Sequence, residues 1–256
     1  MSGKIIRRLK PEEEEILRKR EELAVIQANL AERELELVDL RSQLAAFEGR
    51  YLRQVGTLYA ELDEWKARIA ELKALLEPSS TANAREAREQ ARQTFEDAHG
   101  KASEAHDFTP SPELKSLFRE VAKRIHPDFA TDSADQKRRT RFMAAANHAY
   151  QAGDAEELQR ILDQYEEGAE AVKGEGIGAE LIRIIRQISL ARTRLSEIEE
   201  ELATLRQSEV ALLKAQAEER DQEGRDLLTE LANAVKEQIA LARKEYDDLA
   251  KQGAPR

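Results

Sequence analysis

His126, Pro127 and Asp128 are three consecutive residues whose types suit contact with another protein. Pro127 cannot continue a helix and disfavours helical backbone at His126, so a stiff turn is expected there with all three side chains exposed. A rigid turn presents an imidazole and a carboxylate to a partner in one definite geometry. The triplet needs the sequence around it before it indicates a recognition site.

A basic stripe precedes this turn on one face of a predicted helix that begins at Pro112. Lys115, Arg119 and Lys123 recur at four-residue intervals, with Arg124 beside them. Like charges at this spacing destabilise a helix by a few tenths of a kcal/mol per pair, so the stripe indicates an acidic partner. A solvated basic face without a partner is the alternative. The opposite, buried face is expected to contain Leu114, Leu117, Phe118, Val121 and Ile125.

The turn and its helix belong to a predicted compact helical unit over residues 111–167. Pro110 and Pro112 break the chain before this unit, because each proline also restricts the residue in front of it. A further helix is expected to end at Tyr150, and a short one follows Gly153. The glycine-rich residues 168–179 are the predicted linker that closes the unit.

Two long helical arms, over residues 11–77 and 180–251, are predicted to flank this unit. Their apolar residues alternate steps of three and four, which is the spacing of a coiled-coil seam. The first seam contains Leu23, Ile26, Leu30, Leu37, Leu40, Leu44, Phe47 and Tyr51, and the second contains Leu181, Ile185, Ile188, Leu195, Ile198, Leu202, Leu205 and Leu212. Steps of four near Tyr51 shift the phase of the first seam and predict local unwinding. The second seam weakens around Gly224.

Arms of matched length on either side of one small unit favour an antiparallel hairpin with that unit at its tip. A parallel homodimer along each arm is the alternative. Residues 78–110 contain few large apolar side chains and are expected to form a connecting helix or linker. Joints at Pro78, Pro110 and Gly174 predict that the small unit can reorient, which tight packing against both arms would contradict.

The composition of the 256 residues narrows the class of protein. Charged residues make up 36% and aromatic residues only 5%, which favours elongated helices over one large core. The absence of cysteine excludes disulfides, thiolate nucleophiles and cysteine metal sites. Neither a spanning helix nor a signal peptide is recognisable, so a cytoplasmic location is expected. A net charge of −10 argues against coating nucleic acid or an anionic membrane.

Residues 114–128, together with Asn147-His148-Ala149-Tyr150 downstream, resemble the second helix, the HPD loop and the end of the third helix of J-domains. J-domains are the docking module of Hsp70 co-chaperones. The similarity covers about 55 of the 256 residues. The family's usual first helix is not recognisable before Pro112, so we expect the Phe95 region or a coiled-coil arm to cover the unit's apolar face. Phe129 stands where the family commonly has a basic residue.

The resemblance implies a role for each matching residue. His126, Pro127 and Asp128 would contact an Hsp70 and trigger its ATP hydrolysis, which makes this chain a chaperone of the co-chaperone class with a part in protein folding. Lys115, Arg119, Lys123 and Arg124 would form the electrostatic docking face, because charges at the edge of an interface set encounter rate and orientation. The arms would bind a client or scaffold protein, or form a homo-oligomer.

A second interpretation stays open, in which a structural coiled-coil scaffold carries a degenerate, non-stimulating J-like unit. No enzyme activity, catalytic residue, cofactor or metal site is predicted. The four histidines are widely spaced and lack the pairing of a zinc site. The basic cluster at residues 137–141 could extend the Hsp70 surface, but a nucleic-acid partner is not expected from one short cluster in an acidic chain. A membrane-surface role is not expected, because the seams are narrow.

Overall fold

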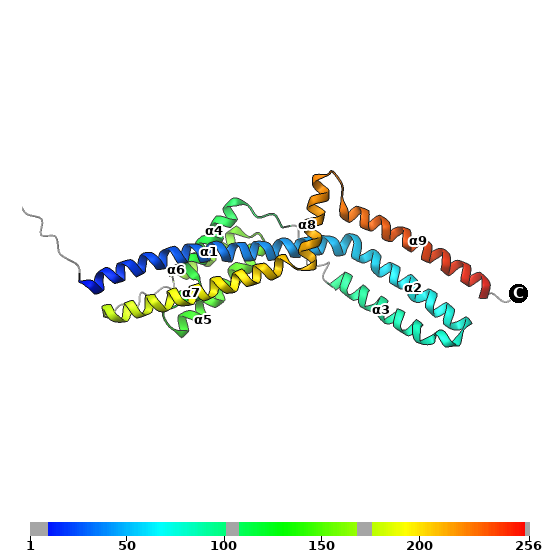
Figure 1. Cartoon of the computed structure of the whole chain (residues 1–256), viewed down its shortest axis with the longest axis horizontal. Coiled ribbons are helices and arrows are strands. Elements are labelled where there is room, and N and C mark those ends of the chain that lie inside the picture. The colour runs from blue at the N-terminus through cyan, green and yellow to red at the C-terminus, as the bar shows by residue number, and fades with distance from the viewer. Residues whose placement is uncertain (1–9, 101–107, 168–175, 254–256) are drawn as a thin grey trace, which may run out of the picture. The chain divides into compact units, whose positions relative to one another are not determined.

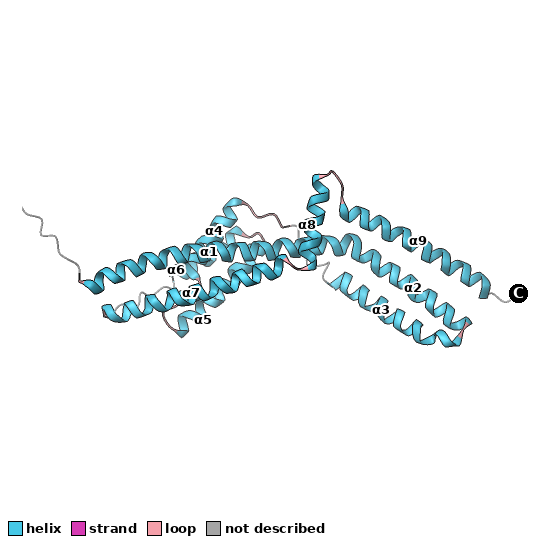
Figure 2. Cartoon of the chain, viewed as in Figure 1, coloured by secondary structure: helices cyan, strands magenta, loops and turns pink. Residues whose placement is uncertain are grey.

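The computed structural model describes residues 10–100, 108–167 and 176–253. Within these ranges all regular structure is helical, which confirms the predicted all-α fold class (Figures 1 and 2). None of the helices described is long and apolar enough to span a bilayer. Residues 168–175 of the predicted glycine-rich linker and residues 101–107 of the predicted connecting segment lie outside the described ranges.

The chain forms two compact units, and each unit combines segments that are distant in the sequence. The first contains Met1–Ser42 and Phe108–Arg206, and the second contains Gln43–Asp107 and Gln207–Arg256. The helix α1, Pro11–Tyr51, contributes to both. Its first turn contains the proline and three of the four glutamates that follow it, and these carboxylates suit the positive end of the helix dipole.

In the first unit, α1 packs along α7, Ile177–Arg206, through the apolar seam. Leu30 and Leu37 of α1 and Ile198 of α7 are fully or almost fully buried in this seam. The register differs slightly from the predicted one, since Ile184 is buried and Ile185 is 47% exposed.

The direction of α7 corrects the predicted antiparallel hairpin. Arg20 is paired with Glu180, and Arg41 of α1 with Glu201 of α7, so the two helices run parallel. Inside the second unit, the N-terminal and C-terminal arms also run parallel, because Gln54 contacts Thr229 and Lys73 contacts Glu245. The hairpin prediction was wrong because the segment after Pro78 makes its own reversal.

That reversal is helix α3, Thr81–Gly100, which runs antiparallel to α2, Thr57–Leu76. Arg88 of α3 bonds to both Glu71 and Glu64 of α2. The helices approach closely because α3 buries a seven-residue repeat of small side chains, Ala84, Ala91 and Ala98. Alanine therefore supplies an interface that a search for large apolar residues overlooked.

On its other side α2 contacts α9, Leu227–Gly253, within the second unit. Trp65 and Tyr246 meet edge to face there, with ring centroids 5.7 Å apart. Just before α2, a π-helical turn at Leu52–Gly56 lies where the seam was predicted to change phase.

The second arm was predicted as one helix, and it is instead divided into α7, α8 and α9. Helix α7 ends at Arg206, and Ser208 caps α8, Glu209–Gln222, by accepting a hydrogen bond from the amide of Ala211. Gly224, with φ of +73°, then makes a turn that side-chain-bearing residues rarely adopt. The weak seam around this glycine marked a real helix end.

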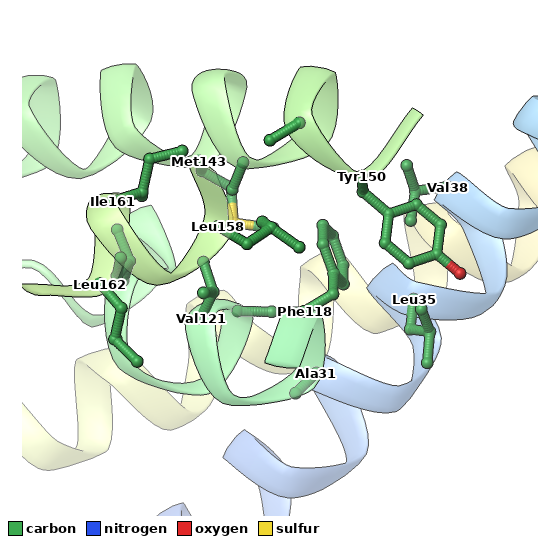
Figure 3. Packing of buried hydrophobic residues seen from close by; sticks show 14 of the residues in the cluster. Ala31, Leu35, Val38, Phe118, Val121, Met143, Tyr150, Leu158, Ile161 and Leu162 are labelled. Carbon is green, nitrogen blue, oxygen red and sulfur yellow. The ribbon is translucent and has the colours of Figure 1, made fainter. Parts of the chain in front are cut away.

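Residues 111–167, named the J-like unit below for their resemblance to J-domains, form three helices in the first unit: α4, Pro112–Ile125; α5, Ser133–Gln151; and α6, Ala155–Glu167. Phe118 of α4 and Tyr150 of α5 form the centre of their common core (Figure 3). Arm residues of α1 complete this core, namely Ala31, Leu35 and Val38.

The expectation that an arm covers the apolar face is confirmed, whereas Phe95 is 55% exposed and belongs to the second unit. Packing against α1 and α7 contradicts the predicted freedom to reorient.

Candidate partner-docking site

Local capping interactions place the turn between α4 and α5. The hydroxyl of Ser111 accepts a hydrogen bond from the amide of Leu114 at the start of α4. The helix ends at Ile125, and Pro127–Phe129 form one turn of 3₁₀ helix. Asp132 then caps α5 by accepting bonds from the amides of residues 134 and 135. The chain thus reverses within a few residues, with the His-Pro-Asp triplet at the reversal.

The side chain of His126 is only 3% exposed, which corrects the expectation that all three residues of the triplet would face solvent. Its Nδ1 accepts a hydrogen bond from the amide of Asp128 at 3.2 Å. Its Nε2 lies 3.1 Å from Oε1 of Glu34 on α1. Because Nδ1 accepts, the ring that fits this arrangement is the neutral tautomer whose Nε2–H donates to Glu34. Both nitrogens of His126 are therefore occupied within the chain.

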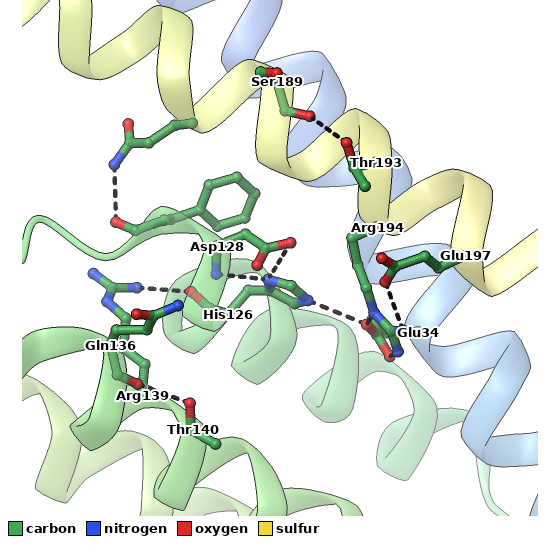
Figure 4. A network of polar contacts seen from close by, with 12 residues as sticks. Glu34, His126, Asp128, Gln136, Arg139, Thr140, Ser189, Thr193, Arg194 and Glu197 are labelled. Atoms are coloured by element: carbon green, nitrogen blue, oxygen red, sulfur yellow. Dashed lines mark hydrogen bonds and ion pairs between the residues drawn. The ribbon is translucent and has the colours of Figure 1, made fainter. Parts of the chain in front are cut away.

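Glu34 connects the turn to both long helices of the first unit. Arg194 of α7 donates to its two carboxylate oxygens at 2.8 and 3.4 Å (Figure 4). Arg194 also donates to Glu201 at 2.9 Å. Burial alone would raise the pKa of Glu34, but the hydrogen bonds from His126 and Arg194 outweigh it and lower that pKa. The carboxylate stays charged because its two donors replace the water that burial removes.

The side chain of Asp128 is 21% exposed, whereas that of His126 is 3% exposed. Burial raises its pKa, and the nearby His126 and Arg194 only partly oppose this effect. Oδ2 of Asp128 is 3.7 Å from Nδ1 of His126. Asp128 is thus the more accessible polar group of the triplet.

Two of the four residues of the predicted basic stripe contact acidic side chains of α1. Lys115 donates to Asp39 at 2.9 Å, and Arg119 is paired with Glu32. These two cations face acidic groups of the same chain. They match the predicted preference for an acidic partner, with α1 as that partner in this conformation.

The end of the stripe nearest the turn is more open. Lys123 and Arg124 are both exposed, and Arg124 pairs with Glu120 at 2.6 Å and with Glu166. The structure therefore brings the predicted docking residues onto one helix and its turn. Lys123 and Arg124 are exposed, Lys115, Arg119 and Asp128 are partly buried, and His126 is buried.

Two further residues hold the backbone of the turn. Arg139 of α5 donates to the carbonyl oxygens of Arg124 at 2.9 Å and His126 at 3.3 Å, and so caps the end of α4. Gln187 of α7 donates to the carbonyl oxygen of Phe129 at 2.9 Å. Phe129 itself is buried in the seam with α7. An apolar residue at this position thus anchors the turn to the second arm.

Sequence reasoning missed Glu34, Arg194 and Asp39 as part of this site. One signal was available for Glu34, which lies four residues after Leu30 and three before Leu37. A carboxylate so close to two seam leucines is expected to be partly buried and to need a partner. The identity of that partner was not readable, because His126 is 92 residues away.

No group of three or more histidine, aspartate or glutamate side chains in the described ranges is arranged to hold a metal ion. No family model matches this chain, and no curated protein or solved structure shows significant similarity to it.

Proposed function

We propose that this chain is a J-domain-type co-chaperone that docks on an Hsp70 and stimulates its ATP hydrolysis through His126, Pro127 and Asp128. The observation that carries the proposal is the antiparallel pair α4 and α5 with this triplet at its reversal. Arg139, in the first half of α5, reaches the end of α4, while Phe118, midway along α4, meets Tyr150 near the end of α5, with ring centroids 4.9 Å apart.

Charge supports an acidic partner surface. Lys123 and Arg124 adjoin the turn on the exposed side of α4, and Lys115 and Arg119 extend the same face. Each of these cations can form a charge-assisted hydrogen bond to a carboxylate. In such a complex the chain supplies no catalytic group, and its contribution is to hold an Hsp70 in a state that hydrolyses ATP.

The two arms support a positioning role. Their apolar seams are filled within one chain, by α7 against α1 and by α9 against α2. The arms would therefore bind clients or scaffold proteins mainly through their charged outer faces. A cytoplasmic site of action is part of the same proposal.

The scaffold with a non-stimulating J-like unit is the second candidate, and the burial of His126 favours it. A residue whose two ring nitrogens both have partners inside the chain is not available to a second protein. Under this interpretation the triplet is a structural joint between α4, α1 and α7.

Single-turnover ATP hydrolysis by the purified Hsp70 of the same organism separates the two candidates. Under the co-chaperone proposal the wild-type chain accelerates hydrolysis, and Asp128→Asn abolishes that effect. Asp128 is the better test residue because its side chain is partly exposed, while His126→Gln also removes an internal hydrogen bond. Circular dichroism should show equal helicity in the variants. Equal stimulation by wild type and Asp128→Asn would contradict the proposal.

A further inference from the structure

Three carboxylates of α1 pair with three of the residues through which the J-like unit would dock. Glu32 pairs with Arg119, Asp39 with Lys115, and Glu34 with His126. Glu32 and Asp39 are seven residues apart and therefore lie on one face of the helix. This face carries the same charge that the basic stripe is expected to recognise in a partner.

Apolar contacts reinforce these ion pairs. Ala31, Leu35 and Val38 of α1 belong to a hydrophobic cluster whose other buried members come from α4, α5 and α6. The hydroxyl of Tyr150 also donates to Asp39, so one carboxylate of α1 holds both α4 and α5. Most of the core of the J-like unit is thus its own, and α1 adds a strip along its edge (Figure 3).

Resting on the proposed function, we propose that α1 is a built-in competitor that keeps the docking face closed until the J-like unit separates from it. An Hsp70 must compete with Asp39 for Lys115 and with Glu32 for Arg119, and it cannot reach the buried His126 while Glu34 holds it. Docking therefore exchanges these internal pairs for pairs with the partner. The apparent affinity is reduced by the fraction of molecules that are closed.

Helix α7 fixes the closed state at its other side. Arg194 bonds to Glu34, Gln187 bonds to the backbone of Phe129, and the Phe129 ring lies in the seam of α1 and α7. Opening must therefore detach the turn from α7 as well as α4 from α1. A partner that binds the outer faces of the arms could favour either state.

The first test removes charge from α1 and leaves every docking residue intact. The variant Glu32→Gln with Asp39→Asn is expected to raise Hsp70 stimulation at subsaturating protein by about threefold or more, because each partly exposed ion pair contributes a fraction of a kcal/mol to closure. The matched control is Glu12→Gln with Glu21→Gln, which changes two exposed carboxylates near the start of the same helix. The control should stimulate as wild type does.

A second experiment measures the separation of the J-like unit from α1 directly, without any Hsp70. The chain has no cysteine, so Ala31→Cys introduces a single thiol at a position that is 4% exposed beneath α4. Its rate of maleimide labelling should rise in the charge-removal variant by a factor similar to the gain in stimulation. An unchanged labelling rate would show that these carboxylates do not hold the unit closed, and would overturn the inference.

A third test locks the closed state. Ala28 and Glu120 line one cavity between α1 and α4, so cysteines at both positions can be joined by a cleavable bis-maleimide. Cross-linked protein should lose stimulation, and cleavage of the linker should restore it. Protein with both thiols capped by a monofunctional maleimide is the control for the substitutions themselves.

The outcomes separate the two proposals. Full stimulation by cross-linked protein would overturn closure by α1 while leaving the co-chaperone function intact. Faster labelling of Ala31→Cys in the charge-removal variant, with no stimulation from any form, would overturn the co-chaperone function and with it the regulatory role of α1.

Discussion

Arg194 of α7 donates two hydrogen bonds to Glu34 of α1, and the imidazole of His126 donates a third to the same carboxylate. This arrangement places the histidine of the predicted recognition turn against α1 and α7, the two longest helices of its unit. The stability of the packing between the turn, α1 and α7 therefore depends on one buried charge, the carboxylate of Glu34. Removing that charge is the most direct perturbation of the structure.

We expect Glu34→Gln to destabilise the first unit by about 1–3 kcal/mol, because Arg194 keeps its charge in a partly buried position and loses its main partner. For a unit of this size the loss corresponds to a decrease in Tm of roughly 2–10 °C. Thermal unfolding followed by circular dichroism measures it. Glu21→Gln, at an exposed position of the same helix, should change stability by less than about 0.5 kcal/mol.

The lowered pKa of Glu34 predicts the direction of the pH dependence. A carboxyl group whose pKa is lower in the folded state than its ordinary value of 4.5 stabilises the fold above that value. This stabilisation is lost as pH falls below 4.5 through the folded-state pKa. The raised pKa of Asp128 acts in the opposite direction, so the informative quantity is the difference between wild type and Glu34→Gln.

Urea unfolding at a series of pH values tests this expectation. The stability difference between the two proteins should be largest near neutral pH and should shrink as the solution is acidified below 4.5. A difference that is constant across the acid range would show that the Glu34 carboxylate does not act through its charge.

Arg139→Ala should loosen the turn and the bundle together, because this side chain caps α4, pairs with Asp135 and lies over the ring of Tyr165. The expected cost is about 1–3 kcal/mol, measured by chemical denaturation. Arg141→Ala, at an exposed position one half-turn further along α5, is the matched control and should be nearly neutral. Equal effects of both changes would point to helix propensity as the cause.

Ala91→Leu should destabilise the second unit, because the α2 and α3 backbones approach each other through small residues. Overpacking of this kind typically costs about 1–3 kcal/mol. Ala82→Leu adds the same atoms at an exposed position of α3 and should be tolerated. Thermal unfolding of the two variants compares them directly.

The parallel course of α1 and α7 can be tested with pairs of spin labels in the cysteine-free chain. Labels at Arg20 and Glu180 should be close, since these side chains are paired. Labels at Arg20 and Arg206 should be roughly 40 Å apart, because about 26 residues of helix separate positions 180 and 206. Double electron–electron resonance distinguishes this pattern from the reversed one that an antiparallel pair would give.

Local features of the fold were predictable because they depend on neighbouring residues. Pro112 and Ser111 begin α4, Pro127 ends it, and Gly224 marks an interruption that the weakened seam had indicated. The direction of the arms was not predictable, because heptad spacing is the same for parallel and antiparallel pairs. It was decided by α3, whose interface with α2 is made of alanines.

The predicted docking residues show the same limit. Their place on one helix and its turn could be inferred from the order of residues 114–128, but their burial could not. His126 and Lys115 are covered by Glu34 and Asp39, which are 92 and 76 positions away, and a single sequence does not reveal such pairs. The Phe129 departure from the family pattern was visible, and its reason became clear only from its place in the seam with α7.

The 160 positions that separate Arg41 from Glu201 also set a problem for synthesis of the chain. At about 5–20 residues per second, α1 leaves the ribosome roughly 10–30 s before the helix that covers its seam. During that interval its apolar stripe has no native partner from the same chain. Neighbouring nascent chains on one messenger would carry identical unpaired stripes, so pairing between copies is the misassembly that this topology must outcompete.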